Sequence, residues 1–327
     1  MSFAPAPYNG LTPDRVLDAL DSVGLAGDGR MLALNSYENR VYQCWRESAA
    51  PVVVKFYRPG RWSDAQILEE HAFALALAAA EIPAVPPIVH AGTTLHRVGE
   101  FRFAAYPRRG GRAPELDRRE TLVQIGRFLG RLHMVGRAEP FHDRSALSIA
   151  QFGDASRDFL IREHFLPDDL AEVYRGVAEQ ALAGVRSAFE RAGRSASLRL
   201  HGDCHAGNIL WTDAGPHFVD FDDAMTGPAI QDLWMLLSGG REDMERQLAA
   251  VLEGYETFSD FDRRELHLVE ALRTLRLMHY SAWIARRWDD PAFPAAFPWF
   301  NTQRYWQDRI LELREQIALL DEPPLAA

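Results

Sequence analysis

The chain has 327 residues, of which 47% are apolar and 25% are charged, and its formal net charge is −10. A chain of this length forms one large domain or two lobes with an ample core. The negative charge argues against broad affinity for nucleic acid. No apolar run approaches the ~20 residues that a membrane-spanning helix needs. Cys44 and Cys204 are the only cysteines, too few for a disulfide framework or a cysteine zinc site.

The N-terminal segment MSFAPAPYNG has no basic region followed by an apolar stretch. A secretory signal is therefore not expected. Taken together, these features predict a cytoplasmic protein with no membrane or nucleic-acid partner. We also expect the chain to be a monomer.

The first third of the chain is predicted to be rich in β-structure. A helix is expected to begin at Thr12, with Pro13 in its first turn and apolar residues on one face. A second helix is expected from about Ser63 to Ala80, where Pro83 follows. The predicted strands are the runs of β-formers at Met31–Leu34, Arg40–Trp45, Val52–Phe56 and Phe101–Tyr106.

The remainder is predicted to be mostly helical. Apolar residues recur at helical spacing in four segments, Glu120–Gly136, Arg157–Phe189, Ile230–Leu252 and Leu266–Trp288. The segment Asp290–Trp306 is dense in Pro, Phe and Trp and is expected to be a packed C-terminal cover. The sequence therefore predicts an α+β protein.

Short strands interrupt the helical part at residues 200–223, LHGDCHAGNILWTDAGPHFVDFDD. This stretch contains two acids and an amide whose spacing is typical of a catalytic site. Asn208 lies five residues after Asp203, which matches the D-x-x-x-x-N spacing of a kinase catalytic loop. Asp220 ends the apolar run HFVD. Asp203 is the candidate base that orients the attacking hydroxyl, and Asn208 and Asp220 are the candidate magnesium ligands. Either acid alone would be read as a turn residue, but the set predicts phosphoryl transfer.

Lys55 lies within VVVKF, an otherwise apolar strand. A lysine there is costly unless its ammonium meets an anion. Kinase chemistry places such a lysine on the nucleotide phosphates and holds it with a glutamate from the next helix. Glu69 and Glu70 are both candidates. Glu70 is favoured because Phe73 and Leu77 place its side near the buried stripe.

The turn LNSYENRVY, residues 34–42, occupies the place of a phosphate-covering loop but lacks its glycine pattern. Its polar side chains, Ser36 among them, offer donors for phosphate oxygens. The linker Ala105–Pro107, which contains Tyr106, is where adenine is expected in the cleft.

Three other phosphate or metal sites fit the sequence less well. His201 and His205 flank Cys204, but the segment is not helical and no second Cys/His cluster is near, so a zinc site is not predicted. The G-D-x-H string lacks the further elements of a dinuclear metallophosphoesterase. No P-loop of the form G-x-x-x-x-G-K-[ST] is present.

The catalytic stretch resembles the aminoglycoside-phosphotransferase-like branch of the protein-kinase fold. Further blocks look like the bacterial stress response kinase A family, and they span most of the chain: NSYENRVYQ, VVVKFYRPGRW, ILEEH, LRLHGDCHAGNILW, GPAIQDLWMLL and DPAFPAAFPWF.

This resemblance implies a cytoplasmic, ATP-dependent serine/threonine protein kinase that acts in stress protection. It implies a bilobal fold, with an antiparallel-sheet N-lobe over residues 1–106 and a mostly helical C-lobe over 107–327. Asp203 would accept the proton, Asn208 and Asp220 would bind Mg²⁺, Ser36 would lie at the ATP site, and Asp232 would brace the catalytic loop. Its acceptors would be Ser and Thr of proteins, its own chain included.

Two departures from ordinary protein kinases stand out. Asp222 takes the place of the glycine that follows Asp-Phe, and no A-P-E segment or activation loop follows Asp220. Gating by activation-loop phosphorylation is therefore not expected. The catalytic residues alone fit equally well a small-molecule kinase for an amino-sugar, amino alcohol or sugar. A silent ATP-binding module is disfavoured because no catalytic group is missing.

Overall fold

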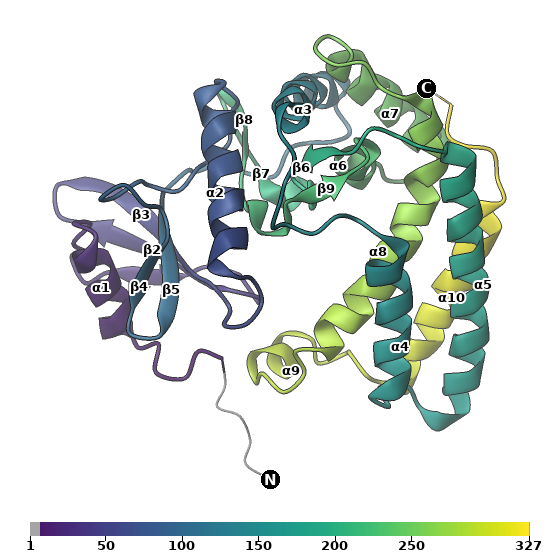
Figure 1. Ribbon diagram of the computed structural model, residues 1–327, viewed down its shortest axis with the longest axis horizontal. Coiled ribbons are helices and arrows are strands. Elements are labelled where there is room, and N and C mark those ends of the chain that lie inside the picture. The colour runs from purple at the N-terminus through teal and green to yellow at the C-terminus, as the bar shows by residue number, and fades with distance from the viewer. Residues whose placement is uncertain (1–6, 327) are drawn as a thin grey trace.

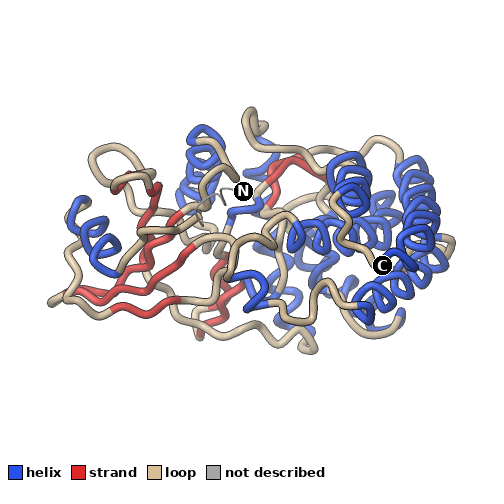
Figure 2. The backbone as a smooth tube through the Cα atoms, turned by 90° about the horizontal axis from the view of Figure 1, so that it is seen from below, coloured by secondary structure: helices blue, strands red, loops and turns tan. Residues whose placement is uncertain are grey.

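The computed structural model of the chain describes residues 7–326. The start of the segment examined for a secretory signal, residues 1–6, and the last residue of the expected C-lobe, 327, lie outside the described range. Strands gather at one end of the molecule and helices fill the other (Figures 1 and 2). The predicted α+β architecture with an antiparallel sheet and a helical region is confirmed.

The sheet end is a five-stranded antiparallel sheet in the order β1-β2-β3-β5-β4. Its strands are β1 (Met31–Ala33), β2 (Arg40–Arg46), β3 (Ala49–Phe56), β4 (His96–Val98) and β5 (Phe101–Pro107). Lys55 lies opposite Val41 on one side and Ala104 on the other, so its strand is central. The sequence did not predict β4, which is only three residues long.

Two capped helices accompany the sheet. In α1 (Pro13–Ser22) the Thr12 hydroxyl accepts the Arg15 backbone N–H. In α2 (Asp64–Ala79) Ser63 and Gln66 form a reciprocal capping box. Both helices begin where the sequence predicted them. Figure 1 shows α2 between the sheet and the helical end, and it contacts both α3 and the turn Phe221–Asp223.

The helical end contains two packed groups of helices. They are α3 (Arg119–Ala138), α4 (Ala155–Arg162), α5 (Asp168–Ala192), α6 (Ile230–Leu233), α7 (Arg241–Tyr255), α8 (Val269–Ala285), α9 (Ala292–Ala296) and α10 (Gln303–Leu320). α3 packs on α7, and α5 packs on α10. None of the helices within residues 7–326 combines the length and the hydrophobicity that crossing a membrane would require.

Two of the segments predicted to be mostly helical are interrupted, and a third begins later than predicted. The Arg157–Phe189 segment breaks between α4 and α5, where His164 adopts a positive φ of 53° and Pro167 precedes the next helix. The Ile230–Leu252 segment breaks after a 3₁₀ turn, at Gly239, whose φ is 88°. Residues 263–268 are 3₁₀ rather than α-helical, so α8 starts at Val269.

Two small antiparallel ladders carry the stretch 198–227. One pairs β6 (Leu198–Leu200) with β9 (Met225–Gly227), and the other pairs β7 (Ile209–Thr212) with β8 (Gly215–Phe218). Phe218 also exchanges backbone hydrogen bonds with Pro83 and Val85. This bond pair ties the β7–β8 hairpin to the segment that follows α2.

The aromatic segment after α8 is packed, as predicted. Phe293, Phe300 and Trp306 are almost fully buried, and their rings make edge-to-face or tilted contacts with those of neighbouring residues. α10 continues this cover with buried Ile310 and Leu313 against α5.

Candidate active site

The loop after β6 is held by one buried carboxylate. Asp232 accepts the backbone N–H groups of His201 and Gly202, each at 2.8 Å, and contacts His133 Nε2 at 3.2 Å. It lies at the start of the helical segment after β9 and is fully buried. Asp232 therefore fixes the backbone immediately before Asp203.

Gly202 permits a close approach of two loops. Its φ is 85°, and a Cβ at this position would lie 2.1 Å from the Asp223 carbonyl oxygen. His201 adds a bond from its Nε2 to the Val219 carbonyl oxygen at 2.9 Å. His201 and Gly202 thus bring the Asp203 loop into close contact with the Asp220 segment. His201 forms a hydrogen bond in this contact and does not act as a metal ligand.

Asp203 is placed with polar neighbours on both carboxylate oxygens. Arg276 Nη1 donates to its Oδ1 at 2.5 Å, and His205 Nε2 lies 3.4 Å from its Oδ2. Burial pushes the pKa of Asp203 upward, but the His205 hydrogen bond and the Arg276 charge outweigh it and hold the pKa well below its usual range. The carboxylate is therefore ionised at neutral pH, as an acceptor of a hydroxyl proton must be.

Asn208 and Asp220 are brought next to one another by a backbone bond. Val219 N–H donates to the Asn208 carbonyl oxygen at 3.0 Å. The Asn208 amide nitrogen donates to the Asp203 carbonyl oxygen at 3.0 Å, so the candidate base and the candidate metal ligand are linked. Asp220 has a φ of 61° and ψ of 64°, an uncommon backbone conformation for a non-glycine residue that recurs at functional sites.

The donor set suits a hard cation held jointly with phosphates. The Asp220 carboxylate is 55% exposed, and Asn208 supplies a neutral oxygen. Mg²⁺ typically takes only one or two carboxylates and completes its shell with waters and phosphate oxygens. Within residues 7–326 no group of three or more His, Cys, Asp or Glu is arranged to hold a metal ion by itself.

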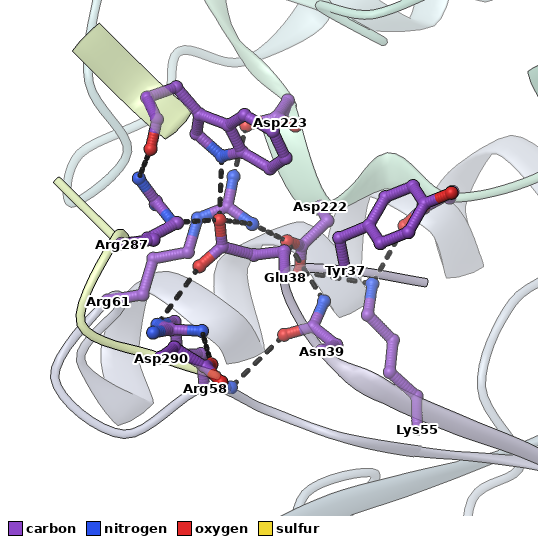
Figure 3. A network of polar contacts seen from close by, with 12 residues as sticks. Tyr37, Glu38, Asn39, Lys55, Arg58, Arg61, Asp222, Asp223, Arg287 and Asp290 are labelled. Carbon is purple, nitrogen blue, oxygen red and sulfur yellow. Dashed lines mark hydrogen bonds and ion pairs between the residues drawn. The ribbon is translucent and has the colours of Figure 1, made fainter. Parts of the chain in front are cut away.

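Lys55 meets two carboxylates from the Asp220 segment (Figure 3). Its Nζ lies 2.9 Å from Asp220 Oδ1 and 3.0 Å from Asp222 Oδ1. Burial works against the ammonium, but Asp220 and Asp222 outweigh it and raise the pKa of Lys55 well above its usual value. The buried Asp222 also forms an ion pair with Arg61, which forms a second ion pair with Asp223.

The two candidate glutamates of α2 have different roles. Glu69 accepts three backbone N–H groups of the loop 142–144, so it orders that loop and faces away from Lys55. Glu70 is buried, and burial raises its pKa to about 7 although the Lys55 charge lowers it. The expected ion pair between Glu70 and Lys55 is absent among the described contacts, because Asp220 and Asp222 are the ion partners of Lys55. The charges of Lys55 and Glu70 still affect each other's pKa.

Glu38, in the turn between β1 and β2, joins the two ends of the molecule. Its Oε2 accepts the Trp283 indole N–H at 2.7 Å and lies 2.5 Å from Arg287 Nε. Its Oε1 lies 3.6 Å from Arg58 Nε, and Arg58 also pairs with Asp290 at 2.9 Å. Figure 3 shows these side chains converging from both ends. The turn that was expected to cover phosphates is therefore anchored to α8 and the segment after it.

The remaining predicted nucleotide contacts lie around this turn and the linker. Ser36 is half-buried, two residues before Glu38. The Tyr106 hydroxyl bonds to the Tyr57 hydroxyl at 2.8 Å, so its polar end is turned into the protein near His71. A direct contact of the Tyr106 hydroxyl with nucleotide would require that bond to be given up, whereas its backbone lies at the end of β5.

Sequence reasoning missed several charged residues of the site. Glu38 and Arg61 lie in blocks that were quoted only for their resemblance. Arg276 was hidden in a segment examined for apolar spacing alone. Arg276 could have been noticed because it lies one helical turn before Tyr280, on the polar face of a helix whose other face is apolar.

Comparison with known proteins identifies the family to which the chain belongs. Residues 31–269 match the model of the "Phosphotransferase enzyme family". "Stress response kinase A" of Escherichia coli O157:H7 is 45% identical over 97% of this chain and 96% of its own length. The chain belongs to the phosphotransferase enzyme family, and within it to the stress response kinase A family. "Serine/threonine protein kinase RdoA" of Salmonella typhimurium is also 45% identical, with the same coverage.

Solved structures share the fold of this phosphotransferase at much lower identity. An amicoumacin kinase has a TM-score of 0.70 at 19% identity, covering 91% of this chain and 90% of its own. A microcompartment-associated aminopropanol kinase has a TM-score of 0.71 at 16% identity, covering 95% of this chain and 97% of its own. At these identities the likeness establishes the bilobal fold alone.

Proposed function

We propose that this phosphotransferase is an ATP- and Mg²⁺-dependent serine/threonine protein kinase of stress response. The observation that carries the proposal is the 45% identity, over 97% of the chain, to a relative named as a serine/threonine protein kinase. The arrangement of Asp203, Asn208, Asp220 and Lys55 supports the reaction type, since each has a role in phosphoryl transfer. We further propose a cytoplasmic monomer that also phosphorylates its own chain.

In this proposal the nucleotide lies between an N-lobe of residues 1–106 and a C-lobe of residues 107–327. Adenine would lie at the end of β5 beside Tyr106, with the phosphates beneath the turn that contains Ser36. Lys55, which pairs with Asp220 and Asp222 and lies near Glu70, would contact phosphate oxygens. Asn208 and Asp220 would hold Mg²⁺, which neutralises phosphate charge when it is bound.

Asp203 would perform the proton step. The acceptor hydroxyl oxygen forms a bond to the γ-phosphorus, its proton passes to the Asp203 carboxylate, and ADP leaves with the electrons of the broken bond. Positioning and charge neutralisation supply most of the rate enhancement in such reactions. The rigid loop around Asp232 and Gly202 is suited to that demand.

A small-molecule kinase is the second candidate. A cavity of about 420 Å³ lies beside Asp203, and such a volume would accept a metabolite. Structural neighbours named as aminopropanol kinase and amicoumacin kinase share the fold.

One experiment separates the two candidates. The protein is incubated with Mg·ATP and either generic acidic and basic proteins or a panel of amino-sugars, amino alcohols and sugars. Phosphopeptide mapping should find phosphoserine and phosphothreonine, on the enzyme itself as well, and Asp203→Asn should abolish them. Saturable phosphorylation of a metabolite at catalytic rates, with no phosphorylated protein, would replace the proposal by the small-molecule function.

A further inference from the structure

The cavity beside Asp203 is lined mainly by α8 and by loops. Asp203 and Asp223 form its catalytic edge, and the opposite wall comes from one face of α8. Residues 276, 280, 283 and 287 recur there at helical spacing. Among the described residues that line the cavity, none belongs to a strand of the five-stranded sheet, and Lys55 is not one of them. The cavity therefore lies on the acceptor side of Asp203.

Its lining is rich in arginine. Arg61, Arg276, Arg286 and Arg287 all face it. Three carboxylates line it as well, but each is already engaged: Glu38 with Arg287, Asp223 with Arg61, and Asp203 with Arg276. Among the described residues, Arg286 has no carboxylate partner.

Arg286 is held in place without being neutralised. Its Nη2 donates to the Ala155 carbonyl oxygen at 3.2 Å, and its guanidinium lies 5.0 Å from the centre of the Phe159 ring. Burial and the charge of Arg162 lower its pKa. Arg286 is exposed at the edge of the cavity, so water solvates its guanidinium as well. With no carboxylate partner among the described residues, the guanidinium is accessible to an incoming anion.

His279 lies among the same positive charges. Its ring lies 4.4 Å from that of Phe152, and its Nδ1 is buried without a hydrogen-bond partner among the described residues. Burial, followed by the charges of Arg286, Arg287, Arg61 and Arg276, lowers the pKa of His279 to about 3. The imidazole is therefore neutral and adds no positive charge of its own to the cavity.

Arg276 links this charge to the reaction. It is 44% exposed and bonds the very carboxylate that must accept the hydroxyl proton. An anionic group of the acceptor would compete with Asp203 for that guanidinium. When the anionic group of the acceptor binds Arg276, one oxygen of the Asp203 carboxylate would become free to accept a hydrogen bond from the acceptor hydroxyl.

We propose that this cavity binds an anionic group that the acceptor carries close to its reacting hydroxyl, with Arg276 and Arg286 as its positioning residues. The inference rests on the proposed function and refines it: the preferred substrates are Ser or Thr segments with a neighbouring carboxylate. The same chemistry could be supplied by a small hydroxy acid or a phosphorylated hydroxy compound. Acceptors with an ammonium group in this position are repelled.

The test compares acceptors that differ only in charge. Serine peptides with Glu, Gln or Lys at the flanking positions, and hydroxy metabolites with a carboxylate or an amine, are assayed with Mg·ATP. We expect kcat/KM for the Glu peptide to exceed that for the Lys peptide at least tenfold. Arg286→Gln should lower the Glu-peptide value about tenfold and leave the Gln peptide unchanged, and Arg286→Glu should shift preference toward Lys. Arg304→Gln, an exposed arginine of α10, should change neither.

Three outcomes are decisive. Peptide phosphorylation with no charge preference, or with preference for Lys, overturns the inference and leaves the protein-kinase proposal intact. Phosphorylation of hydroxy acids alone, with the same dependence on Arg286, supports the anion site and removes the protein-kinase proposal. Calorimetric binding of the peptides with a non-hydrolysable ATP analogue gives a readout independent of turnover, and equal affinities for Glu and Lys peptides overturn the inference.

Discussion

Asp203 keeps its charge in a mostly buried position because Arg276 and His205 offset the cost of burial. Asp203→Asn preserves size and hydrogen bonding but removes the proton acceptor. We expect nucleotide binding to persist while turnover falls about 10²–10⁴-fold. Calorimetric titration of Mg·ATP and steady-state assays measure the two effects separately. Turnover near that of the wild type would remove Asp203 from the base role.

Asp220 should respond differently, because a neutral amide is a poorer ligand for a hard dication. Asp220→Asn is expected to weaken Mg²⁺-dependent nucleotide binding as well as turnover. Titrating Mg²⁺ at fixed ATP into both variants checks this. If the metal dependence were lost in Asp203→Asn and kept in Asp220→Asn, the two roles would have to be exchanged.

Glu70 makes stability depend on pH. Its carboxyl pKa is about 7 in the folded chain against 4.5 as the reference value, so between these values the folded state holds a proton that the unfolded state has released. The contribution of Glu70 to the free energy of unfolding is therefore fully present below pH 4.5 and falls as pH rises toward 7, by up to about 3 kcal/mol. Glu70→Gln should flatten this slope in chemical denaturation at several pH values.

Glu69→Gln is the matched control for that measurement. Glu69 neighbours Glu70 on α2 but binds backbone N–H groups at the surface, so its loss should leave the slope unchanged. Glu265, whose pKa burial also raises to about 7, keeps part of the slope in either variant. A full slope in Glu70→Gln would show that Glu70 is ionised in the folded protein.

At the scale of elements, the β1–β2 turn depends on Glu38. Removing its charge leaves Arg58 and Arg287 with fewer buried anions, which is costly. We expect Glu38→Gln to lower the free energy of unfolding by about 3 kcal/mol and to raise KM for ATP more than it changes kcat. Thermal denaturation and initial-rate kinetics test this. Glu47→Gln, in the exposed β2–β3 turn, is the control and should leave both quantities unaltered.

The elements that the sequence predicted well are those with local signals. Thr12 and Ser63 cap the first turns of α1 and α2 with their own side chains, so the start of each helix can be recognised from nearby residues. The breaks after Arg162 and at Gly239 were missed because apolar spacing continues across them and tertiary packing decides where the chain turns. The three-residue strands β6 and β9 form by pairing with each other across more than twenty residues, and no short window contains that information. β4 was missed for another reason, because it has only three residues, although it pairs with the adjacent β5.

The candidate site shows the same division. Asp203, Asn208 and Asp220 share one stretch of sequence with a recognisable spacing. Arg61, by contrast, reaches Asp222 across 161 positions, and Trp283 reaches Glu38 across 245. These contacts form only when the sheet end and the helical end pack against each other, so a local sequence pattern cannot predict them.

At the scale of the whole molecule, the hydrophobic cores do not follow the two lobes. One core joins α1 to the sheet and includes Leu20, Val54 and Phe103. The largest core instead unites α2, through Phe73 and Leu77, with α3 and α7 of the helical end. Because burial of apolar area is the main source of stability, α2 should unfold together with the helical end and not with the sheet beside which it lies.

Two matched substitutions test this boundary. Leu20 and Leu77 are both fully buried, and replacing either by Ala should cost about 2–5 kcal/mol. In native-state hydrogen exchange, Leu20→Ala is expected to lower the opening free energy of amides in β2, β3 and β5 and to leave those of α2 and α3 unchanged. Leu77→Ala should lower the protection of α2 and α3 amides. Loss of α2 protection in Leu20→Ala would instead place the boundary after β5, because α2 and the sheet would then open as one unit.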